Sequence, residues 1–228
     1  MDEVRRLCVR LLGEPAGAAA AQEAVRAAAG RDRADQLRAA LVACRQTPPA
    51  TAEALDRGGG AGQAAAGTDT SGRRRLADAI AGELRHAVAG LELGEREALA
   101  LRDLLGLSYE EIAAVTDSDP ERVALLLAAA RLGVRERLRG PGQPQPECPE
   151  RERALRTIAA RQDEQPVPAA DDDWLIDHLG HCGGCAQAHA AMLEAAACYR
   201  AWSAAEGPRG GAAGPSDAGR ATAAGAGA

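Results

Sequence analysis

The shortage of large apolar side chains constrains this chain more than any other feature. Its 228 residues include no Phe, two Trp and two Tyr, whereas sandwiches, barrels and parallel sheets depend on aromatic and β-branched residues. Ala makes up about a quarter of the chain, and Ala, Leu, Arg and Glu are strong helix formers. We therefore predict an all-α protein of small helical units, each with a modest core because Ala buries little area.

The charge and the N-terminus bear on where the protein acts. A formal net charge of −6 argues against non-specific nucleic-acid binding by the whole chain. The first ten residues include two acids and no signal-peptide core, and the longest apolar run, 123–130, is far shorter than a membrane span. We expect a cytoplasmic protein with no membrane partner. In that reducing compartment, six Cys favour metal ligands, redox thiols or buried apolar residues over disulfides.

Composition divides the chain into six segments. Gly and Pro at positions 13–17 mark a turn between two helices near the start. Later stretches rich in Gly or Pro lack apolar periodicity and read as linkers. The predicted segments are helices at 1–47, a flexible linker at 48–72, a strongly periodic helical unit at 73–140, a Pro-rich spacer at 141–147, a Cys-rich helical unit at 148–204, and a disordered tail at 205–228.

The periodic unit has the pattern of a helix-turn-helix. Apolar spacing predicts four helices, at about 74–89, 94–105, 108–115 and 119–138. Ser108 with Glu111 and Ser118 with Glu121 fit capping boxes at the starts of the last two. A short helix, a four-residue turn and a longer helix form the motif whose second helix enters the major groove of DNA. An ordinary helical hairpin has the same pattern and stays open on periodicity alone.

Residues 93–113 have the sequence LGEREALALRDLLGLSYEEIA. This segment resembles region 4 of ECF-type sigma factors, the domain that those proteins use at the −35 promoter element. The similarity continues through 118–120 and the Arg-rich stretch 135–138. It implies a non-enzymatic regulator of transcription initiation whose partners are the RNA polymerase core and promoter DNA.

The second helix of this motif departs from its family. Sigma factors usually carry basic and hydroxyl side chains at the positions where this chain has the apolar run 124–129, and residues 73–139 contain 11 Arg against 12 acids. Promoter binding is therefore expected to be weak or lost, because phosphate neutralisation supplies much of such affinity. Leu125 and Leu126 are predicted to contact protein instead, either the chain's own Cys-rich unit or another protein. The remaining DNA-binding candidates are Arg122, Arg131 and Arg135.

The N-terminal helices resemble the opening of sigma region 2 over residues 4–16 and 22–26. In the family that region binds the polymerase core through acids and melts the −10 element with aromatic side chains. Here alanines at 18–21 replace the acidic stretch, and residues 1–72 hold no aromatic side chain, so bases have no ring to stack on. Retained polymerase contact and simple packing remain equal alternatives, and we expect Cys8 and Cys44 to lie in the core.

Four residues of the Cys-rich unit have metal-ligand spacing. His178, Cys182 and Cys185 stand at H-x3-C-x2-C, which brings two sulfurs to one ion with the His one helical turn earlier. Cys148, at the start of the unit, can complete a tetrahedral set. Other residues compete for the fourth position, namely His181, His189 and Cys198.

This arrangement resembles the zinc-binding anti-sigma domain. The resemblance implies one Zn2+, structural or redox-sensing, held by Cys148, His178, Cys182 and Cys185. A four-ligand site leaves no open position for catalysis. Two functions follow as hypotheses: an ECF-type transcription regulator with a fused zinc unit, or an interaction adaptor that keeps the sigma fold without promoter recognition.

Overall fold

The computed structural model describes residues 2–47, 70–142 and 147–205, which form helices and no strand. The predicted all-α class is confirmed for these ranges. The predicted linker lies outside them except for its last residues, where a helix already begins, and the predicted tail lies outside them from residue 206 on. No helix in the described ranges combines the length and apolar character needed to cross a bilayer.

The N-terminal unit has three helices where the sequence predicted two: α1 (Asp2–Leu12), α2 (Ala16–Ala27) and α3 (Arg33–Gln46). The extra break falls at Gly30, which adopts a left-handed φ of 76° that ends the Ala-rich run. Asp32 then caps α3, accepting a hydrogen bond from the backbone N–H of Asp35 at 2.8 Å. The prediction missed this turn because Ala and Arg continue on both sides of it.

The central unit follows with five helical segments. They are α5 (Thr70–Ala89), α6 (Leu93–Leu99), the π-helical turn η1 (Ala100–Leu104), α7 (Tyr109–Thr116) and α8 (Pro120–Arg139). The predicted helix at 94–105 therefore ends in a wider turn, which the apolar spacing alone did not indicate. Helices α7 and α8, joined by a short turn, form the predicted helix-turn-helix.

Of the two predicted N-terminal caps of the helix-turn-helix, only the cap of α7 is as predicted. The Ser108–Glu111 capping box of α7 is confirmed. The second predicted box is wrong, because Asp119 rather than Ser118 caps α8, accepting from the backbone N–H of Arg122 at 2.7 Å. The Ser118 hydroxyl instead lies 2.9 Å from the Thr116 hydroxyl.

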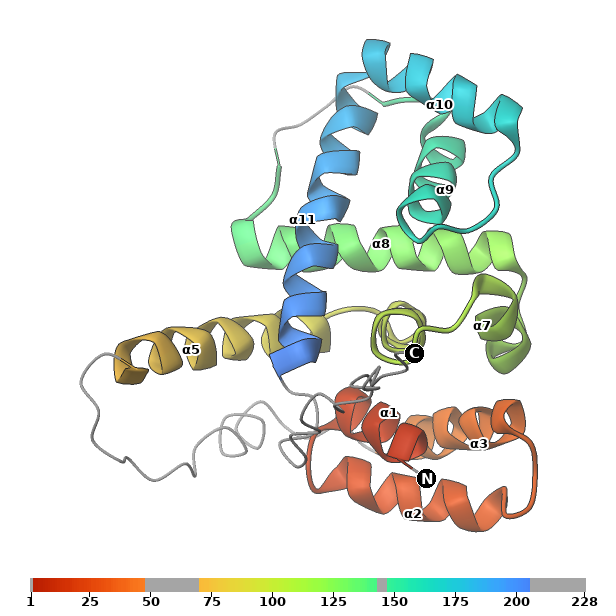
Figure 1. Ribbon diagram of the computed structural model, residues 1–228, viewed down its shortest axis with the longest axis vertical. Helices are drawn as coiled ribbons and strands as arrows, with labels where there is room; N and C mark the ends of the chain where they lie inside the picture. The colour runs from red at the N-terminus through yellow and green to blue at the C-terminus, as the bar shows by residue number, and fades with distance from the viewer. Residues whose placement is uncertain (1, 48–69, 143–146, 206–228) are drawn as a thin grey trace, which may run out of the picture.

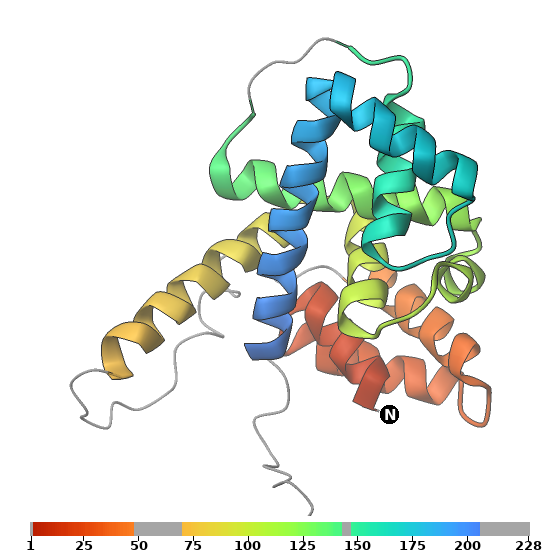
Figure 2. The ribbon, with the colours of Figure 1, turned by 45° about the horizontal axis from the view of Figure 1, so that its top comes forward.

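The C-terminal unit consists of α9 (Arg151–Gln162), α10 (Ala169–His181) and α11 (Gly183–Ala205). Helix α8 runs across the middle of the molecule, and both α9 and α11 pack against it (Figure 1). Helix α11 continues past α8 to contact η1 and α5, and the turned view shows it extending beside them (Figure 2). The helix-turn-helix is thus covered on one side by the Cys-rich unit.

One hydrophobic core joins the three units. Polar contacts add to it between the N-terminal and central units, where Arg45 pairs with the buried carboxylate of Glu97 at 2.6 Å. At the far end of α11, the Trp202 ring lies 3.7 Å from the Arg10 guanidinium on α1. Helix α11 therefore reaches from the C-terminal unit to the N-terminal one.

A close helix crossing in the N-terminal unit depends on Gly17, because a Cβ at this position would overlap the backbone of Val9 on α1. We expect Gly17→Ala to lower the free energy of unfolding by about 1–3 kcal/mol, the usual effect of overpacking. Gly82→Ala on α5 is the matched control, since the nearest atom lies 3.9 Å away, and should stabilise by about 0.5–1 kcal/mol. Urea unfolding measures both, and equal effects of the two variants would contradict the close crossing.

Candidate functional site

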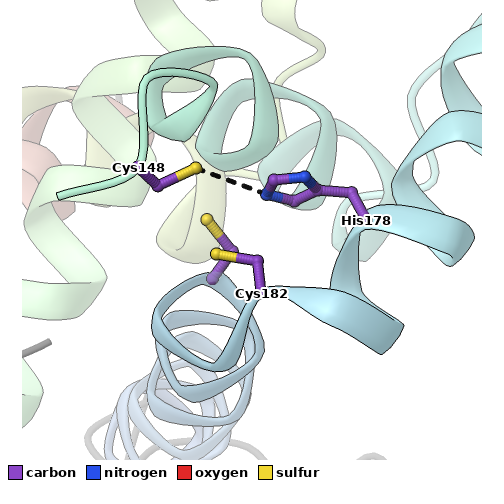
Figure 3. Close-up of side chains that lie close together, drawn as sticks. Cys148, His178 and Cys182 are labelled. Atoms are coloured by element: carbon purple, nitrogen blue, oxygen red, sulfur yellow. Dashed lines mark hydrogen bonds between the residues drawn. The ribbon is translucent and has the colours of Figure 1, made fainter. Parts of the chain in front are cut away.

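Three Cys and one His converge where the ends of three helices meet. Cys148 precedes α9, His178 lies in the last turn of α10, Cys182 follows α10, and Cys185 lies in the first turn of α11. Their ligand atoms all lie within 4.8 Å of one another. In Figure 3 the sulfurs and the imidazole point toward a common centre, with Cys148 Sγ 3.5 Å from His178 Nε2. This cluster could hold a metal ion.

The local backbone explains how both thiols reach the same centre. Helix α10 ends because Cys182 adopts an extended conformation, and α11 restarts at Gly183. The backbone N–H of Cys185 thereby points at the Cys182 sulfur and holds the pKa of that thiol below its ordinary value. Burial raises the pKa of Cys185 to about 12. The two thiols therefore differ, with Cys182 the more readily ionised of the pair.

The three competing ligands lie outside this cluster. His181 is exposed, and its Nδ1 lies 2.9 Å from the Asp177 carbonyl oxygen. His189 and Cys198 lie further along α11. Burial lowers the pKa of His189. Of the four candidates for the fourth metal ligand, Cys148 is the one that lies with His178, Cys182 and Cys185.

The second part of the site is the face of α8 that meets the C-terminal unit. Arg131 was one of the predicted DNA contacts, but its side chain is 1% exposed and does not face outward in this structure. Its guanidinium pairs with Asp163 at 2.8 Å and with Asp103 at 3.3 Å. The physical reason is that α9 and α11 cover this face of α8 and bring a carboxylate to it.

Asp163, which follows α9, is held by three residues of the central unit. Besides Arg131, the Tyr109 hydroxyl donates to its carboxylate at 2.7 Å and Arg102 donates to its carbonyl oxygen at 2.6 Å. We call Arg102, Asp103, Tyr109, Arg131 and Asp163 the ionic cluster. Asp163 was not among the predicted functional residues, since nothing in its sequence neighbours distinguishes it from a solvated acid at a helix end.

Burial is the largest single influence on the pKa values of Asp103, Tyr109 and Arg131. Burial raises the pKa of Asp103 despite the opposing charge of Arg131, and burial followed by the Asp163 charge raises the pKa of Tyr109. For Arg131 burial acts to lower the pKa, but the two carboxylates outweigh it and keep the pKa above its ordinary value. Arg131 is therefore a permanent buried cation whose charge Asp163 balances.

The other predicted contacts on α8 are placed as follows. Arg122 is exposed at the first turn. Arg135 is half-buried, donating to the Gly140 carbonyl at 3.1 Å and lying 3.9 Å from Glu194 of α11. Leu125 and Leu126 are both half-buried rather than freely exposed, and Leu126 packs on the core. Helix α8 thus contacts the Cys-rich unit, and ion pairs are part of that contact.

Comparison with known families agrees with one part of this architecture. Residues 81–132 match the family described as Sigma-70, region 4. The match covers the end of α5 through the first two-thirds of α8, and so contains the helix-turn-helix. No match was found among curated proteins or among solved structures. The central unit is accordingly similar to region 4 of sigma-70 factors, a module of transcription-related proteins.

Replacing Asp163 tests the ionic cluster. We expect Asp163→Asn to lower the free energy of unfolding by about 3 kcal/mol, because it leaves the buried Arg131 charge only partly balanced. The control is Asp172→Asn, which breaks the half-exposed pair with Arg161 at 3.3 Å and should change stability by less than about 1 kcal/mol. Chemical denaturation measures both. Similar losses for both variants would contradict a special role for Asp163.

Metal binding is tested with Co2+, whose thiolate complexes absorb in the near ultraviolet and visible. We expect the full chain to bind one ion, and Cys148→Ser to weaken binding by more than about 100-fold, beyond the usual effect of losing a residue that merely supports a ligand. Cys198→Ser, outside the cluster, should bind like the wild type. Equal binding by the Cys148 and Cys198 variants would remove Cys148 from the ligand set.

Proposed function

We propose that the chain is a regulator of transcription initiation of the ECF sigma factor type, in which a fused zinc-binding unit restrains the region 4 helix-turn-helix. The observation that carries this proposal is the packing of α9 and α11 on α8, the helix that in this motif enters DNA. Restraint follows because a face of α8 that is buried against protein is closed to other partners. The expected partners in the released state are the RNA polymerase core and, weakly, promoter DNA.

Zinc is the metal that we propose for the Cys148, His178, Cys182 and Cys185 cluster. Three thiols and one imidazole are a common donor set of structural zinc sites. A tetrahedral zinc ion with ordinary bond lengths separates a sulfur from a nitrogen ligand by about 3.6 Å, and Cys148 Sγ lies 3.5 Å from His178 Nε2. Bound zinc would clamp the starts of α9 and α11 together. The site has no open position, which favours a structural or redox-sensing role over catalysis.

The two helices that meet at this cluster also make the anchoring contacts. Helix α9 begins three residues after Cys148 and is followed by Asp163, in the ionic cluster on α8. Helix α11 has Cys185 in its first turn and carries Trp202, which packs on Arg10 of the N-terminal unit. Each helix therefore connects the Cys and His cluster at its start to a contact with another unit near its other end. The metal state can thereby bias both contacts in our proposal.

The second candidate function is an interaction adaptor without promoter recognition. It is favoured by the side chains of 124–129 on α8, where Ala and Leu replace the hydrogen-bond donors that read base edges. Of these residues, only Ala129 is exposed. An adaptor would retain protein contacts and show no sequence-dependent DNA affinity.

Pull-down of RNA polymerase core, together with gel shifts on a randomised duplex library over a range of salt, separates the two functions. We expect the metal-loaded wild type to bind core polymerase poorly, and Asp163→Asn and Cys148→Ser to bind it more strongly because the C-terminal unit is released. Asp172→Asn is the control and should behave as the wild type. Failure of every folded variant to retain core polymerase would reject the sigma-type function, and core binding without any DNA selection would favour the adaptor.

A further inference from the structure

The His178 imidazole lacks the support that a metal-bound histidine usually has. Such a ring commonly donates its second N–H to a carboxylate or carbonyl oxygen. His178 directs Nε2 at Cys148, yet among the described residues no such oxygen lies within hydrogen-bond distance of its Nδ1. The last side-chain torsion of His is broad. Another contact of the protein can therefore hold the ring toward the cluster.

That contact is an aromatic stack one helical turn earlier on α10. The Trp174 ring lies parallel to the His178 ring, with centroids 4.9 Å apart and planes 20° apart. The guanidinium of Arg153, on α9, lies 4.0 Å from the centroid of the Trp174 ring. The same guanidinium pairs with Asp171 of α10 at 2.7 Å. Trp174 and Arg153 are both half-buried, so the contacts are partly shielded from water.

These contacts connect the start of α9, next to Cys148, with α10, which carries His178. Arg153 lies in the first turn of α9, five residues after Cys148, whereas Trp174 and His178 share α10. Stacking of a cation on an indole contributes about 0.5–2 kcal/mol, more where water is excluded. The ion pair with Asp171 adds a directional bond to the same guanidinium. Together they can hold the imidazole at the place where it meets the Cys148 sulfur.

We propose that Trp174 is a positioning residue for the metal site, which holds the His178 imidazole by stacking and is itself held by Arg153 and Asp171. This inference rests on the proposed metal site and adds residues to it that are not ligands. A stack takes the place that a hydrogen bond to the second ring nitrogen usually fills. Loss of the Trp174 ring frees the His178 torsion, and metal affinity falls because the ligand must be ordered on binding.

The test is metal affinity by competition with a chromophoric chelator, using Zn2+ and Co2+ on the full chain. We expect Trp174→Ala to weaken binding by about 10–100-fold, the usual effect of removing the support of a ligand. Trp174→Phe, which keeps an aromatic plane, should recover most of the affinity. Ile176→Ala is the matched control on the same helix, since Ile176 is 55% exposed, and should leave the affinity unchanged.

The visible spectrum of bound Co2+ gives a readout that loss of general stability would not change. We expect Trp174→Ala to alter the ligand-field bands through a displaced imidazole, and Trp174→Phe to retain the wild-type spectrum. Should Trp174→Ala fail to fold by circular dichroism, Arg153→Gln removes the cation while keeping the ring and should weaken binding in the same direction. Wild type without stoichiometric metal would reject the metal site itself. Wild-type binding with unchanged affinity and spectrum in the variants would reject only the positioning role.

Discussion

The contact between Asp163 and Arg131 is the interaction on which the arrangement of this protein depends. Both side chains are almost fully buried, and they join the C-terminal unit to the second helix of the helix-turn-helix. Two of the nitrogens of Arg131 and one oxygen of Asp103 have no hydrogen-bond partner among the described residues, so the ionic cluster is not optimised for stability. We infer that its value lies in specificity, because alternative dockings of α9 on α8 would leave a buried guanidinium without its counter-charge.

Small side chains make that docking possible. Ala124 and Ala128 of α8, Ala154 and Ala159 of α9, and Ala195 and Ala196 of α11 are all buried, and such residues let helices approach closely while each contributes little apolar area. A unit as Ala-rich as α9–α11 gains its core by sharing the surface of α8. The proposed metal ligation at the other end of α9 and α11 would fix both ends of these two helices. The Cys and His cluster and the helix-turn-helix therefore belong in one account of function.

Helix α8 packs against protein, and the pattern of its residues agrees with that packing. The buried positions of α8 include Val123, Leu127, Ala130 and Val134, at the helical spacing that the sequence indicated. Polar contacts with the C-terminal unit are supplied by Arg131, by Arg139 with Glu194 at 2.9 Å, and by Glu121 with Arg156. Arg131 and Arg139 are thus paired with acids of the same chain, and any nucleic acid that binds them must compete with those acids.

The sequence by itself determined the all-α class, the helix-turn-helix with its Ser108 cap, and the residue types and spacing of the Cys and His cluster, because these follow from local propensities and from spacings within one or two helical turns. Even there it misplaced a cap at Ser118 and missed the turn at Gly30, where competing local signals lie within a few residues. Only the tertiary structure decided that Arg131 is buried, that Asp163 is its partner and that Cys148 rather than Cys198 joins the other three donors. Those outcomes depend on which helix faces pack together, and the free energy of that packing is shared among residues far apart in the chain.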